Sequence, residues 1–182
     1  MAEYVGLLRG INVSGQKKIK MDELRSKLES LGYQNLRTYI QSGNIVFEST
    51  CLDKEQLEAE IHQNILDNFG FDVPVVVRNK AEWQVAFDSN PFLNGRQEDI
   101  TKLYVAFLQR EPAQEAIADL MTKEIFPDEM ISVDDRIYFF CPNGAARSNI
   151  DNNLIERKLK VKATTRNWKT TTKLLQMLKN EA

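Results

Sequence analysis

One order of strand and helix patterns occurs twice along this chain, and this repetition limits the possible folds more than any other feature. The first copy has strand, helix, two strands in a hairpin, helix, strand and a final helix, expected at residues 4–9, 21–31, 36–41, 44–48, 53–69, 73–77 and 79–89. The second copy has the same order, expected at residues 102–108, 113–124, 130–133, 136–141, 148–159, 161–164 and from 167 on. Alternating apolar residues predict the strands, and apolar spacings of three and four predict the helices.

The repeated order predicts the fold class. A β-α-β-β-α-β order is that of the split βαβ, or ferredoxin-like, unit. We therefore expect an α+β protein of two ferredoxin-like subdomains, each with one added helix, related by internal duplication although their side chains share little identity. The N-terminal subdomain is expected at residues 1–92, a polar linker at 93–101 and the C-terminal subdomain at 102–182.

Polar residues at the starts of the expected helices predict N-caps. Asp53, Asn79 and Asn167 each stand just before a helical pattern, and their side chains can accept hydrogen bonds from the first free N–H groups. Ser148 or Asn149 is expected to begin the helix before the last strand.

The residue types present exclude many enzyme classes. One histidine, His62, is too few for most zinc sites and for Ser–His or Cys–His pairs. Cys51 and Cys141 lack metal-ligand spacing and are expected to be reduced thiols of a cytoplasmic protein. Asp134 and Asp135 lie in a predicted turn, where adjacent carboxylates are expected to point apart. With no Walker A, GxGxxG, CxxC or GxSxG motif, we expect neither a metal nor a cofactor.

Charge is distributed unevenly around a formal net charge of −2. Residues 45–72 hold seven acidic residues and one lysine, whereas residues 145–182 hold nine basic and three acidic residues. A basic segment can attract a polyanion or an acidic partner, and a solvated helix face is the simpler explanation. No apolar run approaches the ~20 residues that cross a bilayer, and no signal peptide pattern is present, so no membrane association is expected.

A first group of polar residues is expected at one edge of the first sheet. The first strand runs into Arg9-Gly10 and a loop with three lysines, and strand ends of this kind present amides and cations to anions. In the expected topology the first two strands run the same way, so this loop and the following hairpin turn share an edge. The candidate ligand-binding residues are Arg9, Asn12, Lys17, Lys18, Ser42 and Asn44, with Ser14, Lys20 and Gln41 beside them.

Each candidate has a structural alternative. Arg9 either binds a phosphate or carboxylate, or pairs with an acidic residue and holds the loop. Asn12, Ser42 and Asn44 either donate to a ligand or bond backbone groups in tight turns. The lysines are expected to form a mobile basic loop.

A second group follows the third and fourth strands of the second half, on the opposite edge of its sheet. Arg147 and Arg166 are the ligand candidates there, whereas Ser148 and Asn167 are expected to be helix caps and Trp168 a core residue. A pseudo-twofold or head-to-tail relation between the halves would let the two groups face one cleft.

Nucleic-acid binding through a sheet face is a further hypothesis, because ferredoxin-like RNA-binding domains stack bases on strand aromatics. Arg136, Tyr138 and Phe140 share one face of a strand, and Tyr104 lies on a neighbouring one. No RNP1 pattern is present, and we expect the other subdomain to cover this face instead.

Four sequence runs resemble a bacterial protein family. They are Leu8-Arg-Gly-Ile-Asn-Val-Ser-Gly-Gln-Lys17, Met21-Asp-Glu-Leu24, Thr38-Tyr-Ile-Gln-Ser-Gly-Asn-Ile-Val-Phe47 and Ala163-Thr-Thr-Arg-Asn-Trp168. Together they are similar to domain-of-unknown-function family 1697 over essentially the whole chain. The resemblance implies a pair of α+β subdomains and carries no activity, substrate or catalytic residue. Ser14 departs from the family pattern, which most often has glycine there.

Three functions follow as alternatives. The first is a module that binds an anionic ligand, either a nucleotide, a phosphorylated metabolite or a nucleic acid, through the polar and basic loops. The second is a metal-independent enzyme acting on a phosphorylated small molecule, with lysines or carboxylates as acid–base groups. The third is a protein-interaction or homo-oligomeric module. The sequence specifies neither a reaction nor an oligomeric state.

Overall fold

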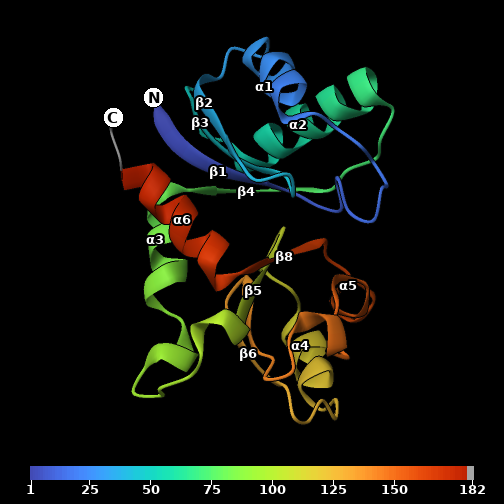
Figure 1. The fold of residues 1–182 in the computed structure, drawn as a ribbon, viewed down its shortest axis with the longest axis vertical. Helices are drawn as coiled ribbons and strands as arrows, with labels where there is room; N and C mark the ends of the chain where they lie inside the picture. The colour runs from blue at the N-terminus through green and yellow to red at the C-terminus, as the bar shows by residue number, and fades with distance from the viewer. Residues whose placement is uncertain (180–182) are drawn as a thin grey trace. The chain divides into compact units, whose positions relative to one another are not determined.

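The structure is a computed structural model that describes residues 1–179. Within this range there are six α-helices and eight strands (Figure 1). The strands form two four-stranded antiparallel sheets. The described residues divide into two compact units, of which the first comprises Met1–Val85 and residues 174–179, and the second Ala86–Lys173. The expected α+β class and duplicated arrangement are therefore confirmed.

The first unit contains the first sheet. Its elements are β1 (Ala2–Leu8), α1 (Met21–Glu29), β2 (Gln34–Tyr39), β3 (Asn44–Ser49), α2 (Lys54–Phe69), β4 (Val75–Asn79) and most of α3 (Lys80–Asp88). The strand order is β2-β3-β1-β4, and every neighbouring pair is antiparallel. Helices α1 and α2 lie along one face of this sheet (Figure 1), where alternate strand residues such as Tyr4 and Phe47 pack on Leu24 and Ile61.

The second unit repeats this plan. Its elements are η1 (Pro91–Leu93), η2 (Ile100–Lys102), β5 (Leu103–Leu108), α4 (Gln114–Met121), β6 (Glu129–Val133), β7 (Arg136–Phe140), η3 (Ala145–Arg147), α5 (Asn152–Leu159), β8 (Ala163–Asn167) and the first part of α6 (Trp168–Lys179). The strand order is β6-β7-β5-β8, again fully antiparallel. Helices α4 and α5 contact each other, and Leu120, Ile155 and Phe139 join in one core.

The two units agree in residue register. In the first, Tyr4 pairs with Asn79 and Val5 with Arg78; in the second, Tyr104 pairs with Asn167 and Val105 with Arg166. Each unit thus ends its last strand in an Arg-Asn dipeptide at the same place opposite the central strand. This agreement supports internal duplication where side-chain identity along the chain is weak.

The helix starts follow the sequence prediction except at α5. Asp53 accepts hydrogen bonds from the first turn of α2, the Asn79 side chain accepts from Glu82 N, and the Asn167 side chain accepts from Thr170 N. The expected start of α5 at Ser148 or Asn149 is wrong. Asp151 is the N-cap, and its carboxylate accepts from Leu154 N at 2.7 Å.

Ser148 has a different local role. It ends the 3-10 helix η3, and its Oγ accepts from Ile150 N at 3.0 Å, so its side chain stabilises the turn before α5. Two residues that can cap a helix lie three positions apart here, and local spacing alone favours neither.

The segment expected as a linker, residues 93–101, falls within the second unit. It contains Arg96, whose guanidinium donates to the carboxylates of Glu98 and Glu129. The domain boundaries suggested by the sequence remain predictions. Among residues 1–179, no helix is long and apolar enough to cross a membrane, and Cys51 and Cys141 are free thiols.

Candidate functional site

The side chain of Asn12 acts as a clamp within the first unit. Its amide nitrogen donates to the carbonyls of Ile19 and Gln41 at 2.8 and 2.9 Å, and its carbonyl oxygen accepts from Ile19 N at 2.8 Å. These bonds tie the loop after β1 to the β2–β3 turn. The two segments therefore share an edge, as the topology predicted, but the bonds occupy the amide that we considered as a ligand donor.

The lysines of this loop differ in their surroundings. The Lys17 ammonium donates to the carbonyl of Asp72, so the expected mobility is wrong for this residue. Lys18 is exposed, and Lys20 is exposed within 3.4 Å of Glu23. Arg9 is half-buried, and its backbone N–H donates to Pro74 O at 3.0 Å, which anchors the end of β1 to the start of β4.

The β2–β3 turn is held by its own polar residues. Asn44 is fully buried, and its amide donates to Tyr39 O at 3.0 Å and to Ser42 Oγ at 3.1 Å. This is the turn chemistry that the sequence offered as the structural alternative. Gly43, between them, has φ of 81°, and its carbonyl accepts from Leu8 N.

Arg166 is a structural residue of β8. It is buried, and its guanidinium donates to Thr164 Oγ1 at 2.8 Å and to Thr165 O at 2.9 Å. Burial lowers the pKa of this guanidinium to about 10, since removal from water disfavours the charged form. Arg78, at the equivalent place in β4, is also buried and donates to Val77 O. A side chain buried at the same place in both units fits a role in the fold.

Arg147 is exposed at the end of η3 and remains accessible to a ligand. It follows β7, whereas Arg166 precedes the end of β8, so both lie toward the same edge of the second sheet. The structure places them there as the topology predicted, but only Arg147 presents its side chain to solvent.

The aromatic face of β7 is covered by Ala86 and Phe92, which belong to the same compact unit as β7. Tyr138 is fully buried, and its hydroxyl donates to Ala86 O at 2.6 Å. Phe140 lies against Phe92, with ring centroids 6.3 Å apart. A buried ring has no free face for a base, so this strand has no stacking platform of the kind used by RNA-binding domains.

The paired carboxylates beside this strand do not point apart. Arg136 donates to Asp135 and to Asp134, each at 3.1 Å, so one buried guanidinium holds both acids of the β6–β7 turn. The prediction from local turn geometry is wrong because the fork of an arginine can engage two carboxylates at once. In the described residues no group of three or more His, Cys, Asp or Glu could hold a metal ion.

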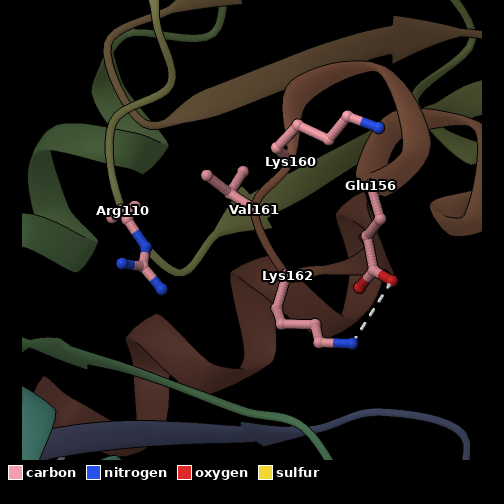
Figure 2. Close-up of a pocket in the computed structure, with 5 residues that line it drawn as sticks. All are labelled: Arg110, Glu156, Lys160, Val161 and Lys162. Atoms are coloured by element: carbon pink, nitrogen blue, oxygen red, sulfur yellow. Dashed lines mark ion pairs between the residues drawn. The ribbon is translucent and has the colours of Figure 1, made fainter.

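A small basic cavity opens at the other edge of the second sheet, where β5 ends and β8 begins. Its volume is about 230 Å³, and it is lined by Arg110, Glu156, Lys160, Val161 and Lys162 (Figure 2). In this view Arg110 lies to one side of Val161, and the two lysine side chains extend to the other, toward Glu156. Three cations and one carboxylate thus surround an apolar residue.

Strand pairing fixes the backbone of this cavity. Gln109 N donates to Lys162 O at 2.8 Å, which joins the ends of β5 and β8 and brings Arg110 near the lysines. Glu156 accepts from Ala163 N at 2.9 Å, and its other carboxylate oxygen lies 4.0 Å from Lys162 Nζ. Within residues 1–179 neither Arg110 nor Lys160 uses its charged group in a hydrogen bond or ion pair, so both are available to a ligand.

Lys160 has an unusual backbone for a lysine. It is the C-cap of α5, in the left-handed region with φ of 57°. Glycine is the residue usually found there, because other L residues have a steric cost in that region. A strained residue that presents a charged side chain to a cavity is a candidate for a functional role.

The equivalent edge of the first unit carries a longer loop, residues 9–20, than the second unit has. There Arg9 N donates to Pro74 O, as Gln109 N donates to Lys162 O in the second unit. The Lys17 ammonium of this loop bonds to Asp72 O. In the second unit only Gln109 to Ala113 separate β5 from α4.

The sequence analysis missed Arg110, Glu156, Lys160 and Lys162. The basic excess of residues 145–182 included the two lysines, but no single loop drew attention to them. The expected topology places the first and fourth strands side by side, so the residues that follow one and precede the other could have been joined on that ground.

Fold and site together define a duplicated α+β protein with an open basic cavity in its second half. The chain belongs to the family described as protein of unknown function (DUF1697), whose family model matches residues 1–138, so the resemblance found in the sequence is confirmed. Its structure is similar to that of the conserved bacterial protein SP0830 from Streptococcus pneumoniae, with a TM-score of 0.77 and 25% identity, over 97% of this chain and 98% of that chain. A comparison with curated proteins finds no match.

Proposed function

We propose that this protein binds an anionic ligand in the cavity formed by Arg110, Lys160 and Lys162. The observation that carries the proposal is that three cationic residues line one cavity of about 230 Å³. Guanidinium and ammonium groups form short, charge-assisted hydrogen bonds with phosphate and carboxylate oxygens, about twice as strong as neutral ones. The anion-binding expectation from the sequence is thus kept as a proposal, with a different set of residues.

The proposed site is formed by the second unit alone, so we propose one binding site per chain. In the first unit a longer loop follows the central strand and Lys17 bonds to Asp72 O, and the basic cavity is lined by residues of the second unit alone. A titration should therefore give a stoichiometry near one.

Isothermal titration calorimetry with glycerol 3-phosphate at low salt tests the site directly. We expect Arg110→Gln and Lys162→Gln each to weaken binding about tenfold, because a hydrogen bond to a charged group contributes roughly 1.5–3 kcal/mol. Lys169→Gln is the matched control, since Lys169 is an exposed lysine of the same unit outside the cavity. If binding is unchanged in both Arg110→Gln and Lys162→Gln, or if Lys169→Gln weakens it equally, the proposed site is wrong.

Salt dependence separates a small anion from a nucleic acid. A polyanion that contacts many phosphates loses affinity steeply with salt, whereas a single phosphate group shows a shallow dependence. A steep slope with short RNA, and no heat with glycerol 3-phosphate, would favour the nucleic-acid alternative. Absence of any binding would leave the protein-interaction alternative.

The assignment of each unit to the ferredoxin-like fold is also part of this proposal. Each unit is ferredoxin-like, and support comes from the antiparallel strand orders β2-β3-β1-β4 and β6-β7-β5-β8. A cytoplasmic location is proposed with it, supported by the two free thiols, Cys51 and Cys141. A crystal structure with another strand order, or fractionation of the protein outside the cytoplasm, would contradict these assignments.

A further inference from the structure

We infer that the ligand of the cavity is a small metabolite that carries a phosphate group and a neighbouring hydroxyl, and that Glu156 selects for the hydroxyl. This inference rests on the proposed function and adds the class of ligand. It starts from Glu156, the one acidic residue in a lining of three cationic residues and Val161.

The cavity size limits the ligand. Sites for drug-sized ligands usually have volumes of roughly 300–1,000 Å³. A cavity of about 230 Å³ lies below this range and accommodates a phosphate with a few carbon atoms. Larger anions, such as nucleotides, would leave most of their surface outside it.

The carboxylate of Glu156 adds a requirement that a bare anion does not meet. Its side chain is 16% exposed and is held in place by the hydrogen bond from Ala163 N to Oε1. The second oxygen, Oε2, lies 4.0 Å from Lys162 Nζ, on the side of Val161 toward which the lysines extend (Figure 2). A ligand anion that binds Lys162 therefore approaches a fixed negative charge, and like charges at this separation repel.

A hydrogen bond from a ligand hydroxyl beside the anion to the Glu156 carboxylate would offset this repulsion. The hydroxyl donates to Glu156, while the phosphate accepts from Lys162, whose Nζ lies 4.0 Å from that carboxylate. Selectivity then combines attraction for the hydroxyl with repulsion of anions that lack a donor.

Glycerol 3-phosphate and propyl phosphate form a matched pair of probes, because they share a carbon chain and a phosphate and differ in the hydroxyls. We expect calorimetry to show glycerol 3-phosphate binding at least about tenfold more tightly to the wild-type chain, given the strength of a hydrogen bond to a carboxylate. In Glu156→Gln this ratio should fall to about threefold or less, and propyl phosphate should bind as tightly as before or more tightly, because the repulsion is gone. The glutamine carbonyl can still accept from Ala163 N, which preserves the local structure.

The ratio of the two affinities separates selection from a folding defect, since both probes bind the same folded fraction. Glu124→Gln, an exposed acid of the second unit, is the control and should leave the ratio unchanged. Equal binding of both probes to the wild type, or the same ratio in Glu156→Gln, would overturn this inference and leave the proposed function standing. Failure of both probes to bind would instead contradict the proposed function.

Discussion

Gly70 and Lys160 occupy the same position in the two halves of the chain. Each is the C-cap of the helix before the last strand of its sheet, and each has a left-handed backbone, with φ of 73° and 57°. Each donates its N–H to the carbonyl four residues earlier, Leu66 O or Glu156 O. The first half uses the residue that this geometry favours, and the second uses a lysine that lines the cavity.

Substitution of Lys160 separates binding from stability. Lys160→Gly should leave the free energy of unfolding unchanged or raise it by up to about 1 kcal/mol. Glycine removes the ~1–2 kcal/mol cost of an L residue in the left-handed region. It also increases the conformational entropy of the unfolded chain, which lowers stability by ~0.4–1 kcal/mol. The same variant should bind glycerol 3-phosphate more weakly. Urea unfolding and calorimetry measure the two effects.

The reciprocal variant provides the control for this prediction. Gly70→Lys makes the reverse change at the equivalent position of the first unit and should lose about 1 kcal/mol of stability without changing phosphate binding. A marked loss of stability in Lys160→Gly would show that the lysine side chain holds the fold.

Asn12 should be important for stability. Asn12→Gly keeps a residue suited to its φ of 55° and removes the three side-chain hydrogen bonds to Ile19 and Gln41. At ~0.5–1.5 kcal/mol for each bond, we expect a loss of about 2 kcal/mol in urea unfolding. Lys18→Gly, at an exposed position of the same loop, should change stability by less than about 1 kcal/mol. Equal effects of the two variants would contradict the clamp.

Gly43 should tolerate no side chain. A Cβ there would lie 2.7 Å from Leu8 Cβ, and φ of 81° adds a conformational cost. We expect Gly43→Ala to destabilise the protein by at least about 2 kcal/mol, from the backbone cost together with overpacking. At Gly32, φ is 88° but a Cβ meets no atom within 4 Å, so Gly32→Ala should cost only about 1 kcal/mol. Thermal unfolding of the pair tests whether the contact with Leu8 adds to the backbone effect.

Cys141 should make stability fall in alkaline solution. Burial raises the pKa of its thiol from 9.0 to about 11, although a hydrogen bond with Ser148 acts in the opposite direction. The unfolded chain therefore releases this proton at a lower pH than the folded chain does. The stabilisation is complete below about pH 9 and is lost as pH rises toward about 11, with an amplitude of roughly 2 kcal/mol.

Comparison with Cys141→Ala isolates this group from other groups that titrate in the same range. The difference in unfolding free energy between wild type and variant should shrink as pH rises from 8.5 toward ~11. A constant difference across this range would show that the thiol has an ordinary pKa.

Local sequence patterns predicted most of the architecture. The caps at Asp53, Asn79 and Asn167 depend on hydrogen bonds within three residues, and the burial of Trp168 follows from the helix that it begins. Patterns of this kind are complete within a few residues, so the sequence displays both partners. The start of α5 is the exception, because Ser148 and Asp151 offer competing local bonds.

Whether a predicted ligand-binding residue is engaged within the fold depends on hydrogen-bond partners far away along the chain. The side chain of Asn12 binds Gln41 O, 29 residues away, and Lys17 binds Asp72 O, 55 residues away. Arg166, chosen as a ligand residue, proved to be buried. No local sequence pattern distinguishes a lysine that donates to a distant carbonyl from one whose ammonium is available to bind a ligand.

By itself the sequence determined the order of the elements, the α+β class, the duplication and the family. The tertiary structure alone decided which charges converge, because the hydrogen bond from Gln109 N to Lys162 O joins two loops that the sequence separates by more than fifty residues. Strand pairing at one edge therefore assembled the cavity, beside a loop after the central strand that is shorter than its equivalent in the first half.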